Sequence, residues 1–235
     1  MSTKEIIPKI VEVIKKIDKR DYEVPSIKFI SNEKNYKGDN FSTYEDNFVT
    51  KFNEFYAQQE LNGQIPNRRE LQRQLQITKR YIYSDYNDPI VERFYNKLQK
   101  RYGQEVNGKI EFETIPDFFI HKDQKDRNPE NQKLIMEFKT EFHLPVNRFM
   151  WDFFKLNLYL VKYNYQTACF VCINNSTDRI ESFLTKYLEE NHYQTSQKQN
   201  LYIIIQESYE AEIKYFSFFD FAKKNGYIKK ASANN

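Results

Sequence analysis

Residues 104–139, QEVNGKIEFETIPDFFIHKDQKDRNPENQKLIMEFK, determine the fold that we predict for this chain. Asn107-Gly108 is the strongest short signal for a β-hairpin turn, and strand-forming residues flank it on both sides. We predict a first strand over 104–106 and a second strand over 109–120. A polar connection then leads to a third, apolar strand over 134–139. The stretch therefore predicts a meander of three strands.

Apolar strands alternate with helical patterns after the meander. The predicted helices and strands are, in order, helix 147–163, strand 168–174, helix 178–190 and strand 201–206. Strands joined through helices pair in parallel, because a parallel connection needs a crossover. Before the meander, Pro89 begins a helix that Gly103 ends. The predicted fold class is α/β, with a mixed sheet flanked by helices.

The N-terminal part of the chain is predicted to be helical, with helices over 9–18 and 43–60. Residues 66–87 have the apolar spacing of a helix-turn-helix, and their local charge is suited to DNA phosphates. The alternative is two short helices with a solvated basic face. We divide the chain into a helical region, 1–88, and a second domain, 89–235. The basic residues expected to contact nucleic acid are Arg68, Arg69, Arg73, Lys79 and Arg80.

Composition excludes several classes of protein. The 235 residues carry 36 Lys and Arg against 33 Asp and Glu, and this small excess does not identify a nucleic-acid binder by itself. The five glycines have neither P-loop nor dinucleotide-binding spacing. No apolar run approaches the ~20 residues of a membrane helix, and the N-terminus has no secretory pattern. Cys169 and Cys172 are predicted core residues, which agrees with a reducing, cytoplasmic location.

Two carboxylates and a lysine form the candidate catalytic constellation. Glu137 and Lys139 are two residues apart on a predicted strand, so they share one face, whereas Phe138 points to the other. Asp117 lies on the neighbouring strand, where it can approach Glu137. Two close carboxylates repel each other unless a cation lies between them, and oxygen ligands suit Mg²⁺. The alternative is a pair of edge-strand carboxylates with Lys139 as a cross-strand partner.

Pro116-Asp117, a hairpin, and Glu137-Phe138-Lys139 at the end of an apolar strand resemble the PD-(D/E)XK nuclease superfamily. The resemblance covers residues 89–174 and implies a restriction-endonuclease-like core. It implies that Asp117, Glu137 and the Phe138 carbonyl bind the metal and that Lys139 activates the attacking water. Some members also have an acid on the helix before the meander and a Q-x-x-x-Y motif on the following helix. In this chain the corresponding residues are Glu92 and, with lysine in place of glutamine, Lys155 and Tyr159.

The function expected from this resemblance is a Mg²⁺-dependent DNA endonuclease of the restriction or transposon and recombination type. Mn²⁺ is expected to substitute for Mg²⁺, and Lys155 to contact a phosphate. The alternatives are a non-catalytic nucleic-acid-binding regulator and an RNA nuclease. One active site cuts one strand at a time, so we expect a homodimer for double-strand cleavage. The aromatic-rich segment 183–221 is the candidate dimer surface, with burial in the core as the alternative.

Overall fold

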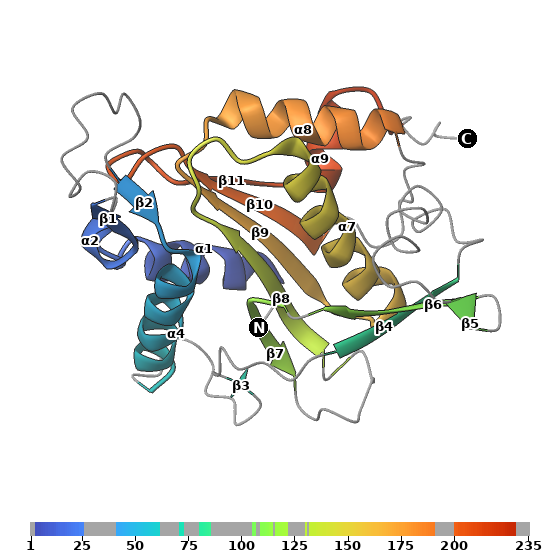
Figure 1. Ribbon diagram of the computed structural model, residues 1–235, viewed down its shortest axis with the longest axis horizontal. Helices are drawn as coiled ribbons and strands as arrows, with labels where there is room; N and C mark the ends of the chain where they lie inside the picture. Colours follow the sequence, from blue (N-terminus) through green and yellow to red (C-terminus); the bar gives the residue numbers. More distant parts are fainter. Residues whose placement is uncertain are drawn as a thin grey trace, which may run out of the picture.

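The protein has a mixed β-sheet with helices on both faces (Figure 1). The computed structural model describes residues 3–25, 41–61, 71–72, 80–85, 105–106, 109–114, 116–121, 130, 132–190 and 200–228. The predicted α/β class is therefore confirmed. No helix within these described residues is long and apolar enough to cross a membrane.

In the part of the chain that the structure describes, the main sheet contains six strands, the first in sequence at Leu71–Gln72 and the last at Lys214–Ser217. Its strands, in spatial order, are β11 (Lys214–Ser217), β10 (Leu201–Gln206), β9 (Thr167–Ile173), β8 (Gln132–Lys139), β7 (Phe118–His121) and β3 (Leu71–Gln72). The β8, β9 and β10 strands are parallel, as predicted from their helical connections. The outer neighbours β7 and β11 pair antiparallel to β8 and β10. β11 was not predicted from the sequence.

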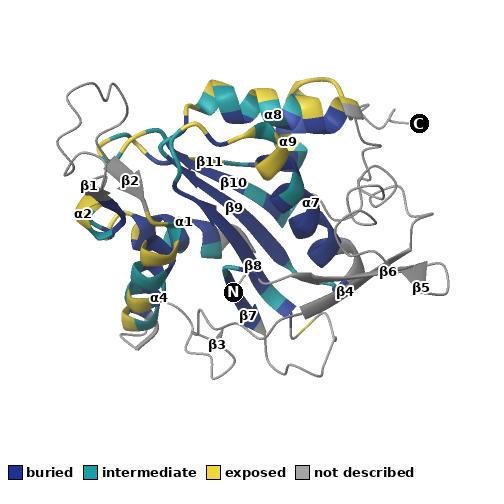
Figure 2. Ribbon diagram, in the orientation of Figure 1, coloured by how far each residue is buried: buried dark blue, intermediate teal, exposed yellow. Residues whose placement is uncertain are grey.

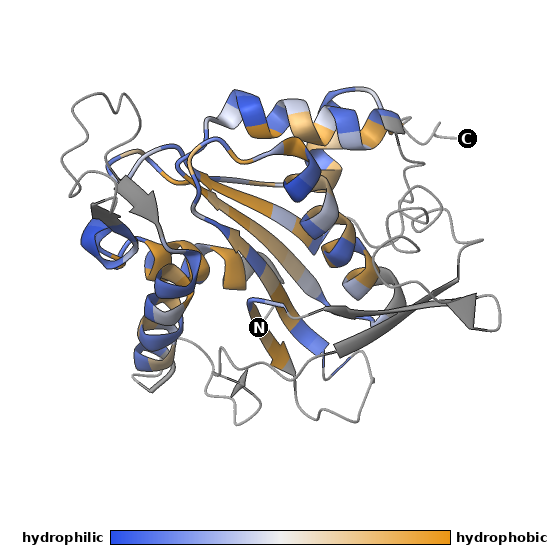
Figure 3. Cartoon of the chain, viewed as in Figure 1, coloured by the Kyte–Doolittle hydropathy of each residue, from blue (hydrophilic) through white to orange (hydrophobic). Residues whose placement is uncertain are grey.

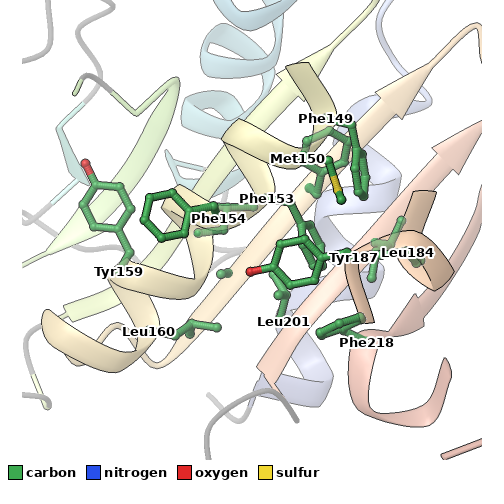
Figure 4. Close-up of a cluster of buried hydrophobic side chains, with 14 of the residues drawn as sticks. Phe149, Met150, Phe153, Phe154, Tyr159, Leu160, Leu184, Tyr187, Leu201 and Phe218 are labelled. Carbon is green, nitrogen blue, oxygen red and sulfur yellow. The ribbon is translucent and has the colours of Figure 1, made fainter. Parts of the chain in front are cut away.

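Three helices cover one face of this sheet. They are α7 (Val146–Lys162), α8 (Thr177–Glu190) and α9 (Phe218–Lys224), and the first two confirm predicted helices. Figure 4 shows their packing: Phe153 of α7 lies against Tyr187 of α8 and Phe218 of α9, with ring centroids 4.9 Å apart in both pairs. Of the aromatic-rich segment proposed as a dimer surface, Tyr187, Phe218 and Phe221 are buried in this core, whereas Tyr215 is exposed.

The N-terminal helices cover the opposite face. Helices α1 (Thr3–Ile14) and α4 (Glu45–Leu61) place their apolar side chains in one cluster with the sheet. Phe52 of α4 lies 4.9 Å from the Phe138 ring and 5.2 Å from the Phe118 ring, centroid to centroid. The predicted N-terminal region thus shares a core with the sheet. Figure 2 shows the sheet buried between helices whose outer sides are exposed, and Figure 3 shows its apolar strands.

Short elements connect α1 to α4. Helix α2 (Lys19–Tyr22) begins after Asp18, whose carboxylate accepts a hydrogen bond from the Arg20 backbone N–H. Strands β1 (Glu23–Pro25) and β2 (Phe41–Thr43) form an antiparallel pair. The first helix was predicted over 9–18, but α1 begins at Thr3 and ends at Ile14, so the prediction was shifted toward the C-terminus.

A second sheet corrects two predictions. It contains β4 (Arg80–Asp85), β6 (Lys109–Thr114) and β5 (Glu105–Val106), and the β5–β6 pairing confirms the hairpin at Asn107-Gly108. The predicted continuous strand over 109–120 is wrong, because β6 belongs to this sheet and β7 to the main sheet. The predicted helix-turn-helix is also wrong over 80–85, where β4 pairs with β6. Tyr81, Ile82 and Tyr83 favour a strand over a recognition helix.

Several predicted features lie outside the described residues. The helix that begins at Pro89 is one of them, together with its candidate metal ligand Glu92. The basic residues Arg68, Arg69, Arg73 and Lys79 are also outside, and Arg80 is described only as the first residue of β4.

Candidate active site

The site begins at the end of β8, where the apolar strand becomes charged. Leu134, Met136 and Phe138 point into the core shared with α1 and α4. The alternating geometry of a strand sends Glu137 and Lys139 to the opposite face, which α7 covers. Both side chains are buried. The prediction that Glu137 and Lys139 share a face, and that Phe138 occupies the other, is confirmed.

Asp117 lies beside this pair, as predicted. It immediately precedes β7, and the register of β7 on β8 pairs Phe118 with Met136. The Phe138 backbone N–H donates a hydrogen bond of 2.7 Å to Asp117 Oδ2. This bond fixes one carboxylate oxygen of Asp117 against the backbone between Glu137 and Lys139.

Helix α7 contributes an acid and a base to the same cluster. Lys155 Nζ lies 2.9 Å from Glu137 Oε1 and 2.8 Å from Asp152 Oδ1. Lys139 Nζ donates to the Phe138 carbonyl at 2.7 Å and lies 3.4 Å from Asp152 Oδ2. Asp152 therefore bridges the two lysines, one from the sheet and one from its own helix.

Helix α4 adds a fourth carboxylate from the other side of the sheet. Glu45 is in the first turn of α4, and its Oε1 accepts a hydrogen bond of 3.0 Å from Lys139 Nζ. Glu45 lies on the more exposed side of the cluster, and 23% of its side chain is exposed. Arg148 of α7, half exposed, lies 3.6 Å from Glu45 and 2.9 Å from Glu141.

The cluster carries more negative than positive charge. Four carboxylates (Glu45, Asp117, Glu137 and Asp152) surround two ammonium groups (Lys139 and Lys155), which gives a formal charge of two minus four, or −2. The Arg148–Glu141 pair at its margin adds no net charge. Burial raises the pKa of Glu137 well above its usual value, although the Lys155 ammonium opposes the rise. Burial likewise raises the pKa of Asp117 and of Glu45.

The pKa values of the two lysines and of Asp152 are shifted so as to favour their charged forms. Burial alone would lower the pKa of Lys139, but nearby carboxylates, with Asp152 the strongest, raise it overall. Glu137 and Asp152 have the same effect on Lys155. Burial favours the neutral form of Asp152, yet Lys155 and Lys139 together hold its pKa below the usual value. Both lysines are therefore charged at neutral pH, and Asp152 is their ionised partner.

The structure brings together four of the residues that the sequence indicated: Asp117, Glu137, Lys139 and Lys155. Lys155 is only 9% exposed and contacts two carboxylates, so it does not face a phosphate as predicted. Tyr159, which completes the motif spacing, is buried in the core. Cys169 and Cys172 are also buried, as predicted, and burial raises the pKa of both thiols.

Sequence reasoning missed Glu45 and Asp152. Glu45 lies within the predicted helix 43–60, in what proves to be the first turn of α4, and nothing in its local sequence linked it to the site. Asp152 precedes Lys155 by three residues, a spacing that places both on one face of a helix. That spacing indicated an ion pair, but nothing in the sequence indicated that the pair faces Glu137.

The donor set fits a divalent cation in its chemistry. Carboxylate and carbonyl oxygens are the ligands that Mg²⁺ prefers, and a buried cluster with a charge of −2 favours a cation. Within the described residues, no group of three or more acidic, histidine or cysteine side chains is arranged to hold a metal. The ammonium groups of Lys139 and Lys155 instead contact one carboxylate oxygen each of Glu45 and Glu137 and both oxygens of Asp152.

Comparisons with known proteins found no match to this chain. No protein-family model matches it, and neither does a curated protein or a solved structure.

Proposed function

We propose that this protein is a Mg²⁺-dependent nuclease that hydrolyses phosphodiester bonds in DNA. The observation that carries the proposal is the buried cluster at the end of β8, where Asp117 is bonded to the backbone between Glu137 and Lys139. Four carboxylates for two ammonium groups give this mostly buried cluster a formal charge of −2, and buried charge is costly unless it is paired. The excess is what a site for a divalent cation requires.

The residues that would hold the metal are Asp117, Glu137 and the Phe138 carbonyl. We add Glu45 as the acid from a flanking helix, a role for which the sequence had indicated Glu92. Glu45 meets the same lysine as the rest of the cluster and lies on its more open side. A metal bound there would polarise the phosphate and lower the pKa of a water molecule.

The chain's own residues would orient the reacting groups. Lys139 is charged and donates to the Phe138 carbonyl and to Glu45, so it would orient these two oxygen ligands and supply positive charge beside the reacting phosphate. Asp152 keeps Lys139 charged from the side of α7. Asp117 is held by the Phe138 N–H and can therefore offer its other carboxylate oxygen in a fixed direction.

Arg148 is the residue we propose for contact with the substrate backbone, the role that the sequence had assigned to Lys155. Its guanidinium is half exposed, next to Glu45 on the open side of the cluster. Guanidinium groups bind phosphate with two parallel hydrogen bonds, which suits a nucleic-acid substrate. The net charge of +3 gives the chain a weak overall attraction to a polyanionic substrate.

The proposal is tested by incubating the protein with supercoiled plasmid, linear duplex DNA and single-stranded RNA, each with Mg²⁺ or with EDTA. We expect cleavage of the two DNA substrates with Mg²⁺ and none with EDTA. Cleavage of RNA alone would establish the RNA nuclease alternative. No cleavage of any substrate with Mg²⁺ or Mn²⁺ would contradict a nuclease function.

An isosteric variant separates catalysis from folding. Glu137→Gln keeps the size and an oxygen acceptor for Lys155 but loses the charge that a metal requires. We expect this variant to be folded by circular dichroism and inactive on plasmid. Glu210→Gln is the matched control, because Glu210 is exposed and distant in sequence from the cluster. Equal activity of Glu137→Gln and Glu210→Gln would place the active site elsewhere.

A further inference from the structure

Lys155 lies in a place that the proposed reaction does not explain. Its side chain is 9% exposed, and its ammonium is held between Glu137 Oε1 at 2.9 Å and Asp152 Oδ1 at 2.8 Å. It is therefore turned toward the sheet and not toward a substrate. Glu137 is 2% exposed and has this ammonium as its ion-pair partner within the described part of the chain.

The two lysines of the cluster hold atoms that a metal would need. Lys155 is bonded to the Glu137 carboxylate, and Lys139 is bonded to the Phe138 carbonyl. Both lysines also contact Asp152, through different oxygens of its carboxylate. An ammonium and a divalent cation cannot share the same oxygen without strong repulsion at such distances. Lys155 contacts Oε1 of Glu137, so a divalent cation that binds this oxygen displaces the ammonium from it.

We infer that Lys155 is a resident counter-ion of the metal site, and that Asp152 is the positioning residue that retains Lys155 when a divalent cation takes Glu137. This inference rests on the proposed metal-dependent function. Without metal, the Lys155 ammonium neutralises Glu137, which would otherwise be a buried and unpaired charge. With metal, Lys155 keeps its bond to Asp152, three residues earlier on the same helix, and is not left without a partner.

The geometry makes this exchange a short movement. Asp152 and Lys155 belong to one helix, so their pairing needs no displacement of α7 relative to the sheet. The lysine stem has four rotatable bonds, and its ammonium already contacts both carboxylates. Asp152 is bonded to Lys139 as well, so its own position does not depend on Lys155 alone.

The exchange has a measurable consequence for metal affinity. Lys155→Gln removes the competing ammonium and changes the formal charge of the cluster from −2 to −3. The repulsion between an ammonium and a divalent cation a few ångströms apart corresponds to at least about a tenfold difference in binding, even with strong dielectric screening. We therefore expect Lys155→Gln to bind Mn²⁺ at least about tenfold more tightly than the wild type. Lys155→Arg retains the charge and should show no such gain.

The test is a titration of Mn²⁺ into each protein, with free Mn²⁺ followed by electron paramagnetic resonance. Lys214→Gln is the matched control, because Lys214 is an exposed lysine paired with Glu207 and should bind Mn²⁺ as the wild type does. Equal or weaker binding by Lys155→Gln, with measurable wild-type binding, would overturn the counter-ion role and leave the metal site standing. Absence of Mn²⁺ binding in every variant would overturn the metal site itself.

A second measurement follows metal binding in the wild-type protein and uses a variant only to assign one signal. The wild-type protein, labelled with ¹⁵N at its lysine side chains, is titrated with Mg²⁺, and the Nζ signal of Lys155 is identified by its loss in Lys155→Arg. We expect this signal to shift as Mg²⁺ saturates the site, because Lys155 exchanges two carboxylate partners for one. A signal that stays in place while Mg²⁺ binds would overturn the inference.

Discussion

Replacing Glu137 with glutamine should stabilise the protein while abolishing its proposed activity. Glu137 is buried, and the cluster has four carboxylates for two ammonium groups. The variant reduces the formal charge from −2 to −1, and Lys155 keeps Asp152 as an ionised partner. Because the raised pKa of Glu137 shows that its charged form is disfavoured in the folded protein, we expect a gain in the free energy of unfolding at pH 8. Its size should be about 1 kcal/mol, which is typical of a single substitution.

The gain should depend on pH in a defined direction. Burial raises the pKa of Glu137 in the folded protein well above 4.5, so folding costs free energy whenever the pH is high enough to ionise the unfolded carboxyl. That cost grows as the pH rises toward the folded-state pKa and disappears as the pH falls to about 4.5. The glutamine variant carries no such cost, and its advantage should therefore be larger at pH 8 than at pH 5.

The assay is urea unfolding followed by circular dichroism, in EDTA, at pH 8 and at pH 5. For a chain of this size, 1 kcal/mol corresponds to a shift of about 2–4 °C in melting temperature, which gives an independent measurement. Glu210→Gln serves again as the exposed control and should change neither value. A loss of 1 kcal/mol or more in Glu137→Gln at pH 8 would refute this reasoning, since it would make the Glu137 charge a net stabilising partner of Lys155.

Three further predictions concern the packing of α4, the Glu207 ion pair and the oligomeric state. Phe52→Ala should cost about 3–5 kcal/mol of stability, because its ring packs between α4 and the sheet, and a urea midpoint within error of the wild type would contradict the shared core. Glu207 accepts hydrogen bonds from Thr177 and Lys214, which lower its pKa to about 2, so Glu207→Gln should lose about 1 kcal/mol at pH 7 for this partly exposed pair. Because a lowered carboxyl pKa stabilises only above the unfolded value of 4.5, that difference should shrink as the pH falls from 4.5 toward 2, and a constant difference would contradict the linkage. A homodimer on DNA should give, in light scattering, the mass of the DNA plus twice the monomer mass, and a monomer that only nicks plasmid would contradict double-strand cleavage.

The sequence predicted the central part of the fold well because periodicity is strongest there. The alternation of Leu134, Met136 and Phe138 with charged Glu137 and Lys139 fixed both the strand and the face of each side chain. Helices that separate apolar strands then required parallel pairing, which the structure confirms.

The predictions failed where a pattern suited two structures. The leucine and isoleucine spacing in 66–87 is compatible with short helices, but Tyr81, Ile82 and Tyr83 form a strand that pairs with β6. The strand over 109–120 was predicted to continue through Pro116-Asp117, whereas these two residues, which disfavour a strand, precede β7 of the other sheet.

The candidate site was predicted in part for a related reason. Asp117, Glu137 and Lys139 belong to adjacent strands, so local pairing rules place them together. Glu45 reaches the same lysine from a helix 94 residues earlier, and only the packing of α4 on the sheet reveals it. Long-range contacts of this kind leave no periodic signal in the sequence.

The most direct test of the central claim is the initial rate of plasmid cleavage with Mg²⁺ for Asp117→Asn and for its control, Asp178→Asn. The first variant keeps an oxygen acceptor for the Phe138 N–H and loses only the charge, and the second loses an exposed carboxylate in α8. We predict cleavage by the wild type and Asp178→Asn, and a loss of at least about a hundredfold for folded Asp117→Asn. Wild-type cleavage rates in Asp117→Asn would contradict the assignment of this cluster as a nuclease active site.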